Sequence, residues 1–102
     1  MPDPHVSKNE GKHRYELHVG SELAGYAEYN VLANGILFTH TEILEPYEGR
    51  GLSSVLVGAA LDDVRAMKTL AIPFCQVVAG FIRKHPEYQD LLSAASRRAF
   101  GG

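Results

Sequence analysis

The segment EPYEGRGLSS, residues 45–54, separates two kinds of apolar pattern and constrains the fold more than any other part of the chain. Apolar and polar residues alternate before it, as in β-strands that bury one face. After it, apolar residues recur at helical spacing from Leu56 to Met67. A strand, a glycine loop and a helix in this order predict an α/β fold, because the helix returns the chain to a strand parallel to the first.

The strands predicted before the loop share the alternating pattern and comprise residues 14–19, 23–32 and 36–44. They should form an antiparallel meander, since Asn34-Gly35 between apolar runs is typical of a hairpin turn. Residues 69–75 predict a fourth strand, parallel to the third. Residues 76–85 predict a second helix that ends before Pro86. We therefore expect a mixed sheet of about four strands with two main helices.

The composition is that of an ordinary globular chain, with 102 residues and a net charge of −2. A chain of this length forms one domain, and its charge gives no electrostatic case for nucleic acid or an anionic membrane. The polar residues 1–12 predict a flexible N-terminal segment, and residues 94–102 a C-terminal tail, around a domain at 13–93. No signal peptide and no apolar run of bilayer length are visible, so we expect a cytoplasmic protein.

The glycine loop places free backbone N–H groups at a helix amino end, where the helix dipole favours an anion. No carboxylate lies in the predicted first turn, whereas Ser53 and Ser54 offer hydroxyl groups and Arg50 a positive charge. The sequence therefore predicts an anion site, with a phosphate as the natural ligand. The alternative is that Gly49 and Gly51 only allow a tight turn.

The stretch THTEILEPYEGRGLSSVLVGAALDDVRA, residues 39–66, resembles the acyl-CoA-binding motif of the GNAT superfamily of N-acetyltransferases. The T-H-T-E strand, the P-x-C strand end and the H-P-E-Y segment are similar to a compact subgroup of that superfamily. The resemblance implies a minimal GNAT-like fold for residues 13–93. It also implies acetyl-CoA as co-substrate.

The resemblance also implies which residues contact the coenzyme. The loop amides would cradle the pyrophosphate, from Gly49, Arg50, Gly51, Leu52, Ser53 and Ser54. Pantetheine would lie between two splayed parallel strands, along an edge formed by Ile43 and Leu44. Pro73 favours such a splay on physical grounds, because proline cannot donate to a strand ladder. Two residues depart from the motif: Glu48 stands where it has Arg or Gln, and Ser53 where it has Gly or Ala.

Three residues are candidates for catalysis. Cys75 is the only cysteine, directly precedes a predicted helix and, by the resemblance, lies near the thioester. His40 and Glu42 share one face of their strand, and either could take a proton from the amine. The structural alternatives are a small buried cysteine, a structural histidine and a solvated glutamate. The five histidines show no zinc-site spacing, so we expect no metal.

Taken with the resemblance, these residues predict an acetyl-CoA-dependent N-acetyltransferase that acts on an amine by direct attack. By the resemblance, family members carry further C-terminal strands that build the acceptor pocket; no such strands are expected from this sequence, and an open site would suit an exposed protein amine better than an enclosed small molecule. The alternative is a non-catalytic domain that binds coenzyme A, or a protein-interaction module. An amine or protein acceptor is thus the expected partner beside acetyl-CoA.

Overall fold

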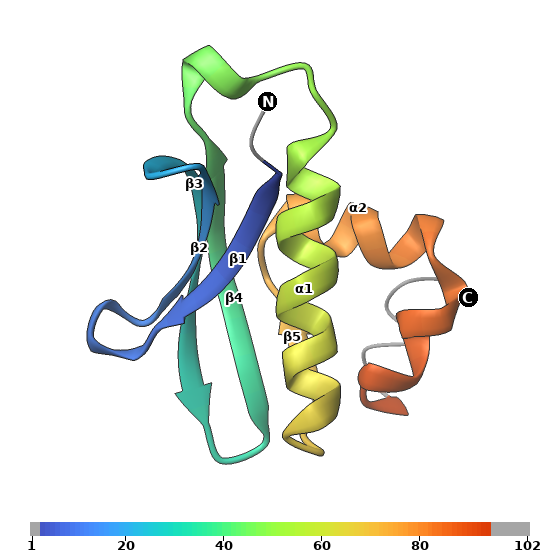
Figure 1. Cartoon of the computed structure of the whole chain (residues 1–102). Helices are drawn as coiled ribbons and strands as arrows, with labels where there is room; N and C mark the ends of the chain where they lie inside the picture. Colours follow the sequence, from blue (N-terminus) through green and yellow to red (C-terminus); the bar gives the residue numbers. More distant parts are fainter. Residues whose placement is uncertain (1–2, 95–102) are drawn as a thin grey trace.

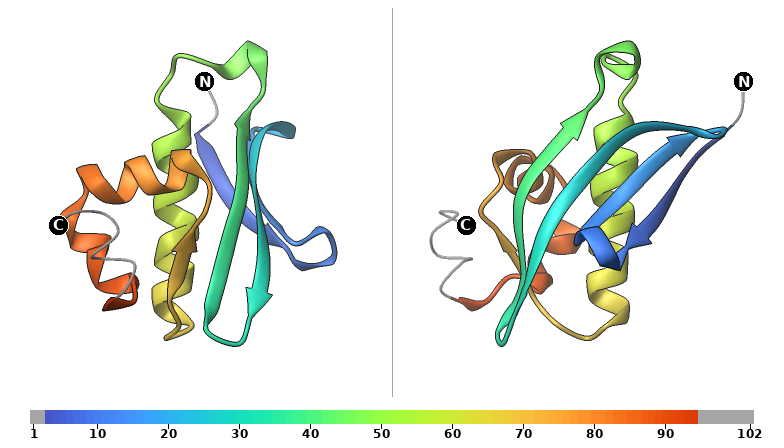
Figure 2. Two further views of the ribbon diagram at one scale, coloured as in Figure 1. Left: turned by 180° about the vertical axis from the view of Figure 1, so that it is seen from behind. Right: turned by 90° about the vertical axis from the view of Figure 1, so that its left-hand side faces the viewer.

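The computed structural model describes residues 3–94 and shows a five-stranded mixed sheet with both long helices on one side of it (Figure 1, Figure 2). The strands are β1 (Pro4–Asn9), β2 (Arg14–Val19), β3 (Glu22–Leu32), β4 (Gly35–Ile43) and β5 (Ala71–Pro73). The helices are α1 (Leu52–Ala66) and α2 (Gln76–Lys84), with short 3-10 turns at Glu10–Lys12, Glu45–Tyr47 and Pro86–Leu91. The predicted α/β fold is confirmed.

The sheet follows chain order, β1-β2-β3-β4-β5. Neighbouring strands are antiparallel except β4 and β5, which are parallel and are joined through α1. The predicted meander and the crossover are therefore confirmed, and the sheet has one strand more than the four predicted. The predicted tail at 94–102 lies outside the described residues apart from its first residue.

The additional strand is β1, and the prediction of a flexible segment is wrong for Pro4–Asn9. These residues pair with β2 along their whole length. Lys8 also joins the strand to α1, because its ammonium lies 3.1 Å from the Asp63 carboxylate. The same ammonium lies over the Tyr15 ring, 5.6 Å from its centroid. Pairing and these contacts order a segment whose own sequence is mostly polar.

The hairpin between β3 and β4 turns at residues 33–34, one position before the predicted Asn34-Gly35. Gly35 pairs with Leu32 and already belongs to β4. A Cβ atom on Gly35 would lie 2.6 Å from the Leu70 carbonyl oxygen, and the Ile36 N–H donates to the same oxygen at 2.8 Å. Glycine is thus required by the close approach of the chain that leads into β5.

A β-bulge interrupts β4 at Thr39. Phe38 lies opposite Tyr29 and His40 lies opposite Glu28, so Thr39 is an extra residue with no partner on β3. The extra residue shifts the alternation of side chains by one position. As a result Phe38 is buried on the helix side, and His40 points to the opposite side of the sheet.

The core lies between the sheet and the two helices. From α1 it contains the predicted apolar stripe, which comprises Leu56, Val57, Ala60, Leu61 and Val64. Met67, predicted as the last member of the stripe, is 40% exposed because α1 ends at Ala66. The sheet contributes the large buried side chains Tyr15, Leu17 and Phe38. This core fixes α1 and thereby the position of the loop before it.

The other side of the sheet is left uncovered by the helices (Figure 2), and most of its side chains are polar. Within residues 3–94 no helix packs on it. Its side chains are half-buried or exposed and include Arg14, Glu16, His18, Tyr26, Glu28, His40 and Glu42. The described helices include none that is both long and apolar enough to cross a membrane.

Candidate functional site

The strands β4 and β5 separate after a short stretch of pairing. They pair over three residues, which end with Phe38 opposite Pro73. The Cys75 N–H then donates to the Phe38 carbonyl at 2.9 Å, and the chain enters α2. From Thr39 to Ile43, β4 continues with no described strand on this side. The predicted splay therefore has a counterpart in the structure, at the level of Pro73.

The separation leaves one edge of β4 unpaired. The sequence placed Ile43 and Leu44 at this edge, and the structure agrees for only one of them. The Leu44 N–H donates to the Ala24 carbonyl at 2.8 Å and is therefore engaged within the sheet. Because backbone groups alternate in direction along a strand, the N–H of Ile43 faces the bare edge. Of the two residues placed there by the sequence, Ile43 alone presents its amide to a ligand.

The glycine loop has two residues in the left-handed backbone region and leads directly into an uncapped helix. Gly49 and Gly51 have φ angles of 78° and 71°, in the left-handed region that glycine favours. A Cβ atom on either would meet nothing within 4 Å, so the conformation and not the space requires glycine. Gly51 is the N-cap of α1, no side chain caps the helix, and no acidic residue lies in its first turn. The N–H groups of Leu52, Ser53 and Ser54 are thus available to an anion.

Two contacts of Tyr47 connect the loop to the start of β3. The Arg50 guanidinium lies 5.5 Å from the centroid of the Tyr47 ring. The Tyr47 hydroxyl donates to the Glu22 carboxylate at 2.6 Å, a hydrogen bond that raises the pKa of the tyrosine. Arg50 and Glu48 are both exposed. A phosphate bound nearby would be attracted by the charge of Arg50 and repelled by that of Glu48.

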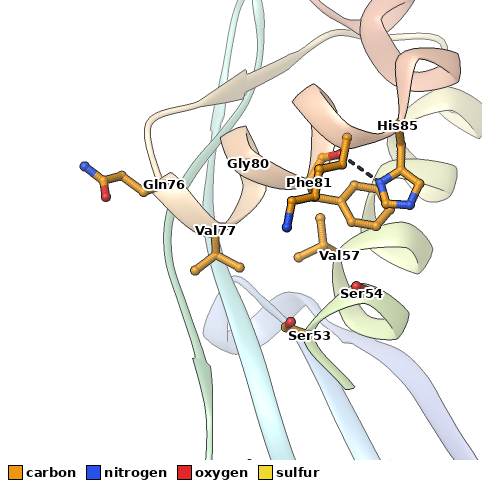
Figure 3. Close-up of a pocket in the computed structure, with 9 residues that line it drawn as sticks. Ser53, Ser54, Val57, Gln76, Val77, Gly80, Phe81 and His85 are labelled. Atoms are coloured by element: carbon orange, nitrogen blue, oxygen red, sulfur yellow. Dashed lines mark hydrogen bonds between the residues drawn. The ribbon is translucent and has the colours of Figure 1, made fainter. Parts of the chain in front are cut away.

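A cavity of about 270 Å³ lies between the first turn of α1 and the length of α2 (Figure 3). From α1 it is lined by Ser53, Ser54 and Val57. From α2 and the residue after it the lining is Gln76, Val77, Gly80, Phe81, Lys84 and His85. The sequence predicted the two serines and missed the α2 side. The α2 side could have been found from the i, i+4 spacing of Gln76, Gly80 and Lys84, which places these residues on one helix face.

His85 has a fixed orientation in this cavity. Its Nδ1 lies 2.9 Å from the Phe81 carbonyl oxygen, and the two rings stack with centroids 4.0 Å apart (Figure 3). A carbonyl oxygen only accepts hydrogen bonds, so Nδ1 is the donor. The other ring nitrogen, Nε2, is left for a ligand.

The three catalytic candidates fall on two sides of β4. His40 and Glu42 meet on the open face, where Nε2 and Oε1 are 3.2 Å apart and both side chains are about half exposed. Cys75 is buried on the helix side, and its thiol donates to the Thr41 hydroxyl at 3.4 Å. The structure thus brings the proposed bases together and separates them from the thiol.

The described part of the chain contains no group of three or more histidine, cysteine or acidic side chains arranged for a metal ion. The features that bear on a site are the uncapped amino end of α1, the unpaired edge of β4 after Phe38 and the cavity between α1 and α2.

Residues 14–91 match the family model of the GCN5-related N-acetyl-transferases. This match covers most of the chain, and the chain belongs to that family. A search of curated proteins gives no match. Family membership agrees with the α/β fold and assigns the general class of the chemistry, which is transfer of an acyl group.

Proposed function

We propose that this protein binds acetyl-CoA at the amino end of α1 and transfers its acetyl group to an amine. The observation that carries the proposal is the uncapped helix end after Gly51, with no acidic residue in the first turn, beside a cavity and a bare strand edge. Family membership supports the same reading. A neutral or cationic ligand would gain little from such a helix end.

The coenzyme would be held at three places. Backbone amides from Gly49 to Ser54 would receive the pyrophosphate, and Arg50 would add charge. Pantetheine would lie along the bare edge of β4 and accept a hydrogen bond from Ile43, in the manner of an added strand. Of the predicted contacts, Leu44 would contribute packing only, because its amide already bonds Ala24.

The transfer step needs one base and one oriented thioester. The amine nitrogen forms a bond to the acetyl carbonyl carbon, the carbon–sulfur bond breaks, and the amine proton passes to a base directly or through water. His40 and Glu42 are the proposed base pair, since they lie 3.2 Å apart on the face from which an acceptor would approach. The departing coenzyme thiolate takes up a proton from solvent.

The open face of the sheet is the proposed acceptor side. It is uncovered by any described helix, and its carboxylates Glu16, Glu28 and Glu42 outnumber the single arginine Arg14. A surface of this shape admits an amine carried by a large molecule, and its charge favours a cation. We therefore propose an exposed protein amine as acceptor.

The binding part of the proposal is tested by a charge placed at the loop. Gly51→Asp puts a carboxylate beside the proposed pyrophosphate, and Gly51→Asn puts a neutral group of the same shape there. Both variants carry the same conformational strain at a φ of 71°. We expect Gly51→Asp to bind acetyl-CoA about tenfold more weakly than Gly51→Asn, because the anions repel each other.

Isothermal titration calorimetry gives these affinities, and thermal melting shows that both variants are folded. Equal affinities in two folded variants would contradict the assignment of the loop. A turnover assay with acetyl-CoA and a panel of amines and peptides then separates transfer from binding alone. Binding without turnover would identify a coenzyme-binding module.

A further inference from the structure

The cavity is lined by residues of α1, of α2 and by His85, with none from β4. Its α2 side runs from Gln76, the first residue of the helix, to Lys84, the last, and on to His85. A helix of nine residues is about 13 Å long. Figure 3 shows Val77 and His85 at opposite ends of the α2 side, with Ser53 and Ser54 of α1 facing the helix. The pyrophosphate site proposed above uses only the α1 side of this space.

The end of the cavity at Lys84 and His85 offers an ammonium and a ring nitrogen to an anion, and the charge of Lys84 opposes the negative carboxyl end of the α2 dipole there. In the described residues, no ion pair joins the Lys84 ammonium to a carboxylate. His85 is held by its bond to Phe81 and keeps Nε2 for a ligand. This nitrogen accepts a hydrogen bond from a protonated phosphate and, when itself protonated, donates one to an ionised phosphate.

Of the carboxylates on the neighbouring elements, Asp62 and Asp90 are engaged elsewhere, whereas Glu87, in the turn after α2, is exposed and forms no ion pair among the described residues. Asp62 of α1 accepts the Tyr88 hydroxyl at 2.8 Å. Asp90 binds the Arg65 guanidinium through both oxygens, at 2.6 and 3.0 Å. These pairs join α1 to the turn after α2. Neither of them involves Lys84, so neither neutralises its charge.

We propose that Lys84 and His85 form a subsite for a phosphomonoester, and that this subsite receives the 3′-phosphate on the ribose of coenzyme A. The inference rests on the proposed function. Ser53 and Ser54 of the first turn of α1 line the same cavity as Lys84 and His85, so a coenzyme whose pyrophosphate bound at that turn would have its nucleotide end within reach of α2. The subsite makes the protein selective for coenzyme A over dephospho-coenzyme A, which differs only in lacking that phosphate.

The test compares the two coenzymes by calorimetry, in the wild type and in Lys84→Gln. We expect the wild type to bind coenzyme A at least tenfold more tightly than dephospho-coenzyme A, and Lys84→Gln to reduce this ratio to about threefold or less. His85→Gln should reduce it as well. Lys12→Gln is the matched control: it removes one exposed lysine charge from the turn between β1 and β2 and should leave the ratio unchanged.

The outcomes separate this inference from the proposed function. If the wild type binds both coenzymes equally, the subsite is refuted and the proposed function stands. If Lys84→Gln weakens both coenzymes by the same factor, the effect is one of general charge and the subsite is again refuted. If neither coenzyme binds to the folded wild type, the proposed function fails and the subsite fails with it.

Discussion

Cys75 lies where β4 and β5 separate, and the groups around its thiol indicate whether it can act as a nucleophile. The thiol contacts the Thr41 hydroxyl, which is not a base, and the pair of His40 and Glu42 lies on the other side of the sheet. A covalent route would need a base beside the thiol to form the nucleophilic thiolate. The arrangement favours direct attack by the amine.

Replacing this cysteine distinguishes the two routes. We expect Cys75→Ala to keep acetyl transfer within about tenfold of the wild type, since only a small buried group is lost and the cavity cost is about 1 kcal/mol. Steady-state kinetics and intact-protein mass after mixing with acetyl-CoA are the measurements. An acetyl group on Cys75 that passes to added amine at the rate of turnover would prove the direct route wrong.

The open-face pair is the proposed base, so its loss should affect the rate and not coenzyme binding. We expect Glu42→Gln to lower kcat about 100-fold and to leave the affinity for acetyl-CoA unchanged. Glu10→Gln is the control, because it removes one exposed carboxylate from the turn between β1 and β2. Stopped assays with a peptide amine measure both variants. An unaltered kcat in Glu42→Gln and in His40→Gln would place the base elsewhere.

At the scale of elements, the sequence predicted those features whose signals are local. Alternation identified β2, β3 and β4, helical spacing identified α1 and α2, and glycine and proline marked their ends. β1 was missed because residues 4–9 contain a single aliphatic side chain, Val6. Its order comes from pairing with β2 and from the Lys8 contact to Asp63, partners that are distant in sequence.

The candidate site divides in the same way. The loop residues from Gly49 to Ser54 are implied by the family resemblance, the glycines and the absence of an acidic first turn are consistent with them, and they stay a prediction. The sequence could not predict that His40 and Cys75 lie on opposite sides of the sheet. The side on which His40 lies depends on the bulge at Thr39, and the alternation of polar and apolar residues does not reveal that bulge. The α2 side of the cavity depends on how two helices pack, which no local pattern specifies.

At the scale of the whole molecule, one carboxylate connects the helix layer to the sheet. Asp63 of α1 accepts the Tyr15 hydroxyl at 2.6 Å and lies 3.1 Å from the Lys8 ammonium. The Tyr15 hydrogen bond, with a further contribution from Lys8, holds the pKa of Asp63 below its usual value. A carboxyl group whose pKa is lower in the folded state stabilises the fold above its unfolded pKa.

This linkage predicts how stability depends on pH. The contribution of Asp63 should be present at neutral pH and should be lost as pH falls below about 4, through its folded pKa. Asp63→Asn should be less stable than the wild type at pH 7 by about 1 kcal/mol, and its stability should fall less on acidification. The stability of the variant should still depend on pH to some extent, because the pKa of Glu16 is also lowered, mainly by its hydrogen bond from Arg14. Urea unfolding at a series of pH values measures this, and identical slopes for both proteins would contradict it.

The bare edge of β4 has a consequence for the molecule in solution. A strand with unpaired backbone groups on one side is a template on which the strand of another molecule can add, and such growth is a route to aggregates. Here the bare stretch is short, running from Thr39 to Ile43, and the bulge at its start twists it away from a flat ladder. A ligand lying along this edge would also act as a shield, so the ligand-free protein is the form most exposed to self-association.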